Sequence, residues 1–312
     1  MKLLTFLKNN QVSLGVKTEK GIVDISASLA VNPIGGIETD IMSVINGGEK
    51  AVSAIEKYIT LLEKEQQSVL LSEEEIDWGL CVTEPNKIIC VGLNYRRHAD
   101  ETNAPYPEVP ILFNKFNNTL TAHLREIEVP KVTNALDYEA ELGIVIGKTA
   151  KYVSVEEALN HVFGYCAVND LSARDLQMRT HQWLLGKTCD GFSPAGPYLV
   201  TADEVGDPQN LQLKTFVNGE ERQNSNTADM IFTCAEIISY ISQHMTLVPG
   251  DLILTGTPEG VILGYPKEKQ VYLQPGDVVT VEIEKLGALT NRFVEDRSVT
   301  KVPTEMDTIR NS

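Results

Sequence analysis

Short apolar runs and one amphipathic repeat fill the first eighty residues. The runs KLLTF, VSLGV and GIVDIS are separated by turn-forming residues, which is typical of short strands. A different pattern follows at 49–66, where apolar residues recur at intervals of three and four: Val52, Ile55, Ile59 and Leu62. This is the spacing of a helix with one apolar face. The pattern predicts a small N-terminal α+β domain over residues 1–80, with a packing or lid-supporting role and no chemistry of its own.

From residue 81 onward, strand-like runs follow one another closely. Gly, Pro and Asn separate them, and they lie at 87–92, 110–116, 141–147, 162–169, 196–201, 211–219, 251–256 and 277–284. Two helices are predicted, one at 154–161 with a capping box of Ser154 and Glu157, and one at 228–245 with an apolar face. Because the strands do not alternate regularly with helices, we expect a mainly β fold with α-helices (α+β) rather than a doubly wound one. The predicted catalytic domain spans 81–296, and a polar tail spans 297–312.

Composition narrows the class of partner. The 312-residue chain has a net charge of −16 and a pI of about 4.8, which disfavours nucleic acid and anionic membranes as partners, since both attract a basic surface. No stretch of about 20 apolar residues is present, and the first ten residues lack the features of a signal peptide. The five cysteines form no CxxC pair, which favours reduced thiols in a cytoplasmic protein: Cys81, Cys90, Cys166, Cys189 and Cys234.

Acidic residues gather in the segment LDYEAELGIVIGK, residues 136–148. Side chains alternate faces along a strand, so Glu139 and Glu141 point the same way, about 7 Å apart. An exposed edge strand would tolerate this pair because water screens the repulsion. A third acid, Asp170, follows the apolar run at 162–169 and favours a metal site instead. Three carboxylates suit Mg²⁺, Mn²⁺ or Ca²⁺, and the lack of a His or Cys ligand makes zinc the weaker expectation.

Six segments, in this order, resemble the fumarylacetoacetate hydrolase family: KIICVGLNYRRHADE, LDYEAELGIVIGK, GYCAVNDLSARDLQ, LLGKTCDGFSPAGPYLV, VNGEERQNSNTADMIF and PGDLILTGTPEGV. The resemblance covers the chain from about Asn86 to Phe293. It implies a mixed β-roll catalytic domain, usually in a homodimer, that holds Mg²⁺ or Mn²⁺ by an ExE pair and a later Asp. On that pattern the metal ligands are Glu139, Glu141 and Asp170, the residues that the strand pattern also selects.

The segment NYRRHADE places His98 three residues before Glu101, so one helical turn would put both on one side. A His held by a carboxylate can take a proton from water. In the smaller members of the family this HxxE arrangement forms a dyad on a lid, which implies that the lid is displaced when no ligand is bound. The alternative is that His98 is an ordinary surface residue of a loop.

The resemblance also implies residues around the metal. Lys187, in LLGKTCDGF, matches a lysine that could donate to a developing enolate oxygen. Arg174 and Gln177 match substrate contacts, and on one helical turn they would share a face with Asp170. Ordinary surface positions are the alternative for Lys187, Arg174 and Gln177. Two further positions that match substrate contacts are Lys115 and Thr257.

The activity that this resemblance implies is metal-dependent hydrolysis of the C–C bond of acylpyruvate-type 2,4-diketo acids, such as acetylpyruvate or fumarylpyruvate, through a metal-bound pyruvate enolate. Oxaloacetate decarboxylation and isomerisation of 2-hydroxyhepta-2,4-diene-1,7-dioate would use the same enolate and are the alternatives. A regulatory module that binds a metal or a keto acid without turnover is the alternative outside the enzymes. The expected partners are a small 2-keto acid and a second copy of the chain.

Overall fold

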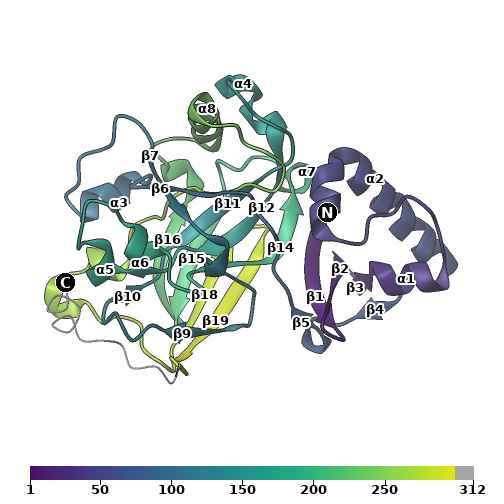
Figure 1. Cartoon of the computed structure of the whole chain (residues 1–312), viewed down its shortest axis with the longest axis horizontal. Coiled ribbons are helices and arrows are strands. Elements are labelled where there is room, and N and C mark those ends of the chain that lie inside the picture. The colour runs from purple at the N-terminus through teal and green to yellow at the C-terminus, as the bar shows by residue number, and fades with distance from the viewer. Residues whose placement is uncertain (299–312) are drawn as a thin grey trace, which may run out of the picture.

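The N-terminal unit consists of short antiparallel strands beside two helices (Figure 1). The computed structural model describes residues 1–298, so the tail predicted over 297–312 lies outside the described residues from 299 onward. The elements of the unit are β1 (Lys2–Lys8), β2 (Gln11–Thr18), β3 (Gly21–Asp24), α1 (Ile25–Val31), α2 (Ile41–Glu65), β4 (Leu70–Leu71), a 3₁₀ turn at Glu73–Glu75 and β5 (Asp77–Trp78).

Helix α2 confirms the amphipathic helix predicted at 49–66, but it begins earlier, at Ile41. Asp40 caps its first turn by accepting a hydrogen bond of 2.9 Å from the backbone N–H of Ser43. The helix breaks at Gly48, whose φ of 55° and ψ of −142° lie outside the helical region. Glycine tolerates this left-handed φ, and the break interrupts the apolar repeat, which is why the pattern indicated only the second half of the helix.

One mixed sheet of twelve strands extends from this unit into the larger one (Figure 1). Its remaining strands are β6 (Ile88–Gly92), β7 (Ile111–Lys115), β8 (Leu120–Thr121), β11 (Ala140–Ile146), β12 (Val162–Asn169), β14 (Ser193–Thr201) and β17 (Leu252–Leu254). The main path runs β4-β3-β2-β1-β14-β12-β11-β17-β6-β7, and antiparallel pairing of β1 with β14 joins the two units. Six of the eight strand runs predicted from residue 81 onward lie in this sheet, and so do the three predicted in the N-terminal unit, which confirms the expected mainly β fold with α-helices.

A second sheet of five strands, in the order β16-β15-β18-β19-β9, lies in the larger unit. Its strands are β9 (Glu126–Val129), β15 (Gln212–Val217), β16 (Glu220–Asn226), β18 (Val278–Ile283) and β19 (Gly287–Glu295), and a separate pair is formed by β10 (Leu136–Asp137) and β13 (Ser172–Ala173). The sequence predicted β15 and β18. It missed β16 because the segment EERQNSN carries no apolar alternation, although β16 pairs with β15 along its length.

Strand β11 is buried on both faces and lies between β12 and β17. One face, with Leu142 and Ile144, packs into the same apolar cluster as Leu213 and Val281 of the five-stranded sheet. The other face, with Val145, belongs to a second cluster that continues into the N-terminal unit. Residues on a strand packed in this way have little freedom to move, so β11 is a rigid support for the acidic residues at its beginning.

The helices of the larger unit are short and differ from the predicted ones. They are α3 (Arg96–Glu101), α4 (Val155–Ala158), α5 (Arg174–Gln177), α6 (Leu184–Lys187), α7 (Ala202–Val205) and α8 (Cys234–His244), with 3₁₀ turns at Asn117–Thr119, Leu159–His161, Thr227–Asp229, Ile262–Gly264 and Lys267–Lys269.

One predicted helix start is right and one is wrong. Ser154 is the N-terminal cap of α4 as predicted, but its side chain makes no capping hydrogen bond, and the helix predicted at 154–161 is one turn of α4 followed by a 3₁₀ turn. The helix predicted at 228–245 begins only at Cys234, because Thr233 and Glu236 form the capping box there.

All five cysteines are free, and four of them are buried. Of the helices in residues 1–298, none is long and apolar enough to cross a membrane.

A half-buried histidine connects β5 to β19. The His123 ring packs edge-on against Trp78, with centroids 4.9 Å apart, and its Nδ1 accepts a 3.0 Å hydrogen bond from the backbone N–H of Thr290. Burial lowers the pKa of His123 to about 4. The unfolded chain, with an ordinary histidine pKa of about 6.5, therefore binds the proton more tightly than the folded protein does, and stability is lost as the pH falls from about 6.5 to about 4.

We therefore expect the Tm to fall between pH 7 and pH 4.5, and to fall less in His123→Gln, since an amide oxygen can accept the Thr290 N–H and does not titrate. Thermal unfolding followed by circular dichroism at both pH values measures the difference. His244→Gln, an exposed position on α8, is the control and should keep the full loss. Equal losses in His123→Gln and the unmodified protein would remove His123 as a source of the pH dependence.

Candidate active site

Three carboxylates meet where β11 begins and β12 ends. The two strands are antiparallel, with Ala140 opposite Asn169, so Glu139 and Glu141 flank a position that adjoins Asp170. The backbone N–H of Asp170 donates to the carbonyl of Glu139 over 2.9 Å. One carboxylate oxygen of each acid lies within 4.8 Å of the others, and all three side chains are buried. The alternative of an exposed edge strand does not apply, because β11 is an interior strand.

The charges of this triad are compensated unevenly. Burial raises the pKa of Glu141 well above its usual range, and the neighbouring Asp170 and Glu139 raise it further. Its hydrogen-bond donor is the backbone N–H of Gly256, 2.7 Å from Oε2. Burial also acts on Glu139, but Lys187 and Arg174 outweigh it and lower the pKa of Glu139 to about 2. The negative charge thus remains least balanced at Glu141, on the side of the cavity.

The three carboxylates fit a hard divalent cation. Oxygen ligands this close together suit Mg²⁺ or Mn²⁺, and a cation would offset the burial of Glu141. Such a cation takes more oxygen ligands than these three, so substrate and water could supply the others.

Lys187 lies beside the triad, as the resemblance implied. Its Nζ is 2.8 Å from Oε2 of Glu139 and 2.9 Å from Oδ2 of Asp170. These two acids outweigh burial and raise the pKa of Lys187, so its ammonium group stays charged. Lys187 also lines the cavity that contains Glu139 and Glu141.

Lys115 lies behind Asp170 rather than against the substrate. Its ammonium group contacts Oδ1 of Asp170 and donates to the carbonyls of Phe192, at 2.6 Å, and Leu171, at 3.3 Å. The side chain is fully buried and does not line the cavity. The prediction of a substrate contact is therefore corrected: three acceptors already engage Lys115, which holds Asp170 in place.

Arg174 is engaged by two carboxylates and an amide. Its Nε is 2.8 Å from Oδ2 of Asp137, its Nη2 is 2.7 Å from Oε1 of Glu139, and its Nη1 donates to Oε1 of Gln177 over 3.0 Å. Arg174 and Gln177 both line the cavity. They do not share a helix with Asp170 as predicted, because β13 lies between Asp170 and the start of α5.

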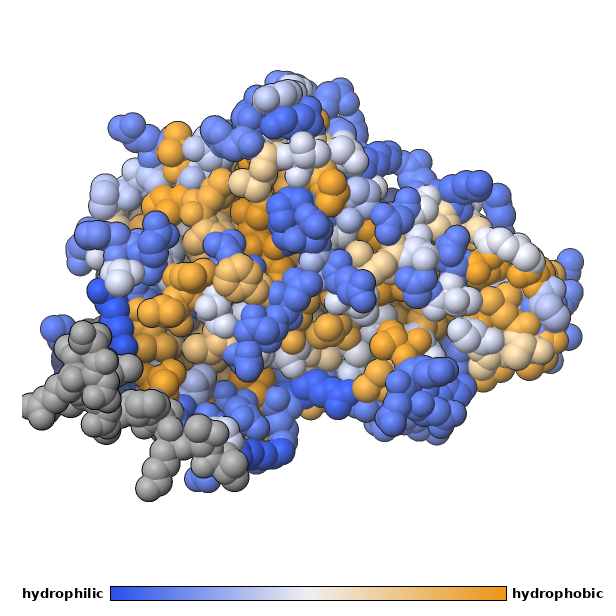
Figure 2. Space-filling view, viewed as in Figure 1, coloured by the Kyte–Doolittle hydropathy of each residue, from blue (hydrophilic) through white to orange (hydrophobic). Residues whose placement is uncertain are grey.

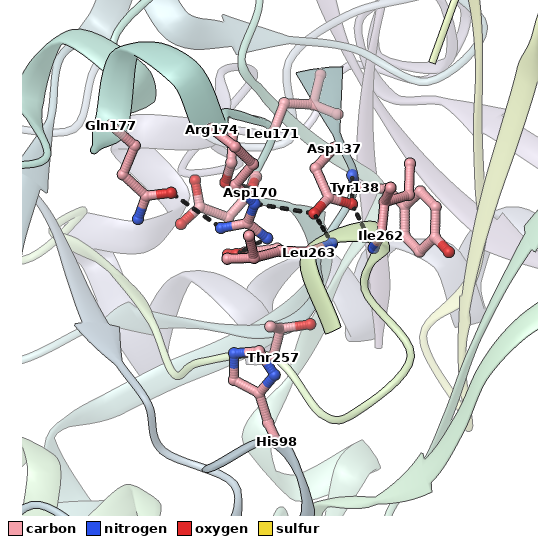
Figure 3. A network of polar contacts seen from close by, with 12 residues as sticks. His98, Asp137, Tyr138, Asp170, Leu171, Arg174, Gln177, Thr257, Ile262 and Leu263 are labelled. Carbon is pink, nitrogen blue, oxygen red and sulfur yellow. Dashed lines mark hydrogen bonds and ion pairs between the residues drawn. The ribbon is translucent and has the colours of Figure 1, made fainter. Parts of the chain in front are cut away.

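Asp137 is a buried site residue to which the sequence assigned no role. Figure 3 shows it between Arg174 and the backbone of Ile262 and Leu263. Its carboxylate accepts hydrogen bonds of 2.9 and 3.0 Å from the N–H groups of Ile262 and Leu263. Asp137 therefore fastens the 262–264 turn to the cavity and orients Arg174. Its place in the acidic run 137–141 was the available signal.

His98 and Glu101 form a pair on α3. The Nδ1 of His98 is 2.7 Å from Oε1 of Glu101, and Oε2 of Glu101 accepts the backbone N–H of Gly260 at 3.0 Å. Gly264 leaves room for this carboxylate, since a Cβ there would lie 2.4 Å from Cδ of Glu101. A proton held on Nδ1 leaves Nε2 as the acceptor. In this structure α3 is folded and His98 is buried against the cavity.

The cavity holds about 250 Å³ and brings most of the predicted residues together. His98 and Thr257 lie below the Arg174–Asp137 network in Figure 3 and line the cavity with Glu139 and Glu141. Thr257 is held by Gln223, whose Nε2 donates to its Oγ1 over 2.9 Å. The sequence missed Gln223 because it belongs to the polar strand β16.

The mixed β fold and this cavity, with a carboxylate triad, a lysine and a His–Glu pair, define an enzyme that is suited to a divalent cation. The sequence comparison is specific: the model of the fumarylacetoacetate hydrolase C-terminal domain matches residues 87–294. The chain belongs to the fumarylacetoacetate hydrolase family.

Relatives within the family have several activities. A mitochondrial oxaloacetate tautomerase of Bos taurus is 41% identical over 88% of this chain and 84% of its own length. A 2,4-didehydro-3-deoxy-L-rhamnonate hydrolase of Sphingomonas sp. (strain SKA58) is 47% identical over 74% of this chain and 81% of its own. The structure of maleylpyruvate hydrolase from Sphingobium sp. SYK-6, in complex with manganese(II) and pyruvate, aligns with a TM-score of 0.76 at 29% identity and covers 95% of this chain and 100% of its own.

If Glu141 is a metal ligand, Glu141→Gln should raise the Kd for Mn²⁺ at least about tenfold, because a neutral amide is a weaker ligand than a carboxylate. Isothermal titration calorimetry with Mn²⁺ measures this. Glu128→Gln, an exposed acid on β9, should leave the Kd unchanged. Equal affinity of Glu141→Gln and the unmodified protein would place the ion elsewhere.

Asp137→Asn should lower the free energy of unfolding by about 2–4 kcal/mol, since it removes one of the two carboxylates that pair with the buried guanidinium of Arg174 and turns an amide NH₂ toward groups that are themselves donors. Urea unfolding measures the change. Asp203→Asn, which alters an exposed acid, should change it by less than about 0.5 kcal/mol. A similarly small effect of Asp137→Asn would contradict the conclusion that Asp137 holds the 262–264 turn and orients Arg174.

Proposed function

We propose that the chain is a divalent-metal-dependent hydrolase that cleaves the C–C bond of acylpyruvate-type 2,4-diketo acids and releases pyruvate. The observation that carries this proposal is the His98–Glu101 pair in the same cavity as the carboxylate triad. Hydrolysis needs a base for the attacking water, and His98 is placed to be that base. The hydrolase from Sphingomonas supports it, since its name specifies a 2,4-didehydro sugar acid.

Glu139, Glu141 and Asp170 would hold Mg²⁺ or Mn²⁺. When bound, such an ion supplies a Lewis acid that orients a 2-keto acid and accepts its developing negative charge. The maleylpyruvate hydrolase complex with manganese(II) and pyruvate is consistent with this assignment. Lys187 adds a fixed positive charge beside Glu139 and Asp170, and Thr257 can donate its hydroxyl hydrogen because Gln223 occupies its oxygen as a donor.

The base acts in two directions during hydrolysis. Nε2 of His98 takes a proton from water while Glu101 holds the proton on Nδ1 and stabilises the imidazolium. The hydroxide attacks the acyl carbonyl carbon, and the bond from that carbon to C3 breaks with its electron pair remaining on C3. The resulting pyruvate enolate accepts a proton at C3, which His98 can return. The products are pyruvate and the carboxylic acid of the acyl group.

Tautomerisation of oxaloacetate is the second candidate. It is favoured by the relative from Bos taurus, which is named an oxaloacetate tautomerase. The same His98–Glu101 pair could move a proton between C3 and bulk water without an attack on an acyl carbon. Decarboxylation of oxaloacetate needs no base, so the presence of the pair does not favour it.

His98→Ala should lower kcat/KM for acetylpyruvate by about 10²–10⁴-fold, the usual contribution of a general base, while the Kd for Mn²⁺ stays within about threefold. Pyruvate release coupled to lactate dehydrogenase measures the first quantity, and calorimetry measures the second. His244→Gln is the matched control and should match the unmodified protein in both.

Turnover that survives in His98→Ala would contradict the role of His98. Mn²⁺ binding by the unmodified protein without turnover of acetylpyruvate or oxaloacetate would favour the regulatory binding module instead.

A further inference from the structure

One wall of the cavity is aromatic. Trp183 and Phe113 line it and pack edge to face, with centroids 5.3 Å apart and planes at 71°. Phe113 lies next to the charged centre, since Nζ of Lys187 is 5.1 Å from its ring centroid. The aromatic wall is therefore adjacent to the carboxylate triad that Lys187 contacts.

Gly92, at the end of β6, lets the indole of Trp183 lie against the strand. A Cβ at Gly92 would meet Cζ3 of Trp183 at 2.4 Å and Cη2 at 2.7 Å. Leu93 and Ala104 continue the apolar lining. Figure 2 shows apolar side chains gathered on the surface in the region of α5 and α6, and Met178, which also lines the cavity, is 67% exposed there.

The cationic side chains that line the cavity among residues 1–298 are Arg174 and Lys187. Arg174 is paired with Asp137 and Glu139, and Lys187 is paired with Glu139 and Asp170. A second carboxylate at the far end of a substrate would therefore compete with Asp137, Glu139 and Asp170 for cations that these acids already neutralise. An uncharged group would bury its surface against Trp183 and Phe113 with no such competition.

We propose that Trp183 and Phe113 form an acyl subsite for an uncharged hydrocarbon group. On the basis of the hydrolase activity proposed above, the preferred substrates are monocarboxylic 2,4-diketo acids with a short alkyl or phenyl acyl group, in preference to dicarboxylic acids such as fumarylpyruvate or oxaloacetate.

The test is kcat/KM along the series acetyl-, propionyl- and butyrylpyruvate, with fumarylpyruvate for comparison. We expect a rise of about fourfold per added methylene, the value of burying one CH₂, and a value for fumarylpyruvate at least about tenfold below that for butyrylpyruvate. Trp183→Ala should remove most of the rise.

Gly92→Ala should have the same effect, because its Cβ would displace the indole while the sequence of α6 and of its N-terminal cap, Trp183, stays unchanged. Agreement of the two variants attributes the effect to the position of the indole. Tyr152→Ala, which removes an exposed aromatic ring outside the cavity, is the control and should keep the full dependence on chain length. Circular dichroism melting verifies that each variant is folded.

A binding measurement keeps the subsite testable if hydrolysis fails. Calorimetry on the Mn²⁺-loaded protein compares oxamate with N-propyloxamate, and the propyl group should lower the Kd at least about tenfold in the unmodified protein but not in Trp183→Ala. No turnover together with this binding difference would refute the hydrolase and leave the subsite. Turnover without a chain-length dependence, or with a preference for fumarylpyruvate, would overturn the subsite and leave the hydrolase.

Discussion

Burial of three carboxylates in one small cavity is the constraint that organises this protein. Such groups repel one another and lose their water, so the surrounding structure must supply positive charge. Lys187 contacts two of the acids, Arg174 holds Glu139 from the cavity lining, and Lys115 holds Asp170 from the side away from the cavity. Glu141 has a backbone donor but no cationic side chain among the ion pairs of residues 1–298. A divalent cation beside Glu141 would supply the positive charge that no side chain in the described part of the chain supplies there.

The fold keeps this arrangement rigid by placing it between well-packed elements. Strand β11 is buried on both faces, and its pairing with β12 fixes Glu139 relative to Asp170. The 262–264 turn is fastened by Asp137 on one side of the cavity, and the preceding Gly260 holds Glu101 and hence the imidazole of His98. The His98–Glu101 pair and the triad are therefore oriented through one loop, although they come from distant parts of the chain.

The sequence predicted those parts of the site that depend on local patterns, namely alternation along a strand and spacing along a helix. Alternation in 136–148 and the acid after β12 were enough to select the triad, and the three-residue spacing together with the family resemblance paired His98 with Glu101. The pattern could not place Lys115, because whether an ammonium group faces a substrate or a carboxylate depends on tertiary packing. Strand β16 and its Gln223 were missed for a related reason: polar residues form a strand there because β15 pairs with them. The family resemblance implied the chemical roles of the site residues, and the structure showed which groups each of them contacts.

The pairing of the buried charges also bears on which substrates the cavity favours. A protein that binds a dicarboxylic acid commonly keeps an arginine available for the second carboxylate. Here the guanidinium in the cavity is already engaged by Asp137 and Glu139, and the wall beyond it is aromatic. A substrate carboxylate at Arg174 would compete with Asp137, whose carboxylate also holds the 262–264 turn next to Glu101. The guanidinium that could recognise a second carboxylate is thus already part of the support of the His98–Glu101 pair, and this competition favours substrates that end in an uncharged group.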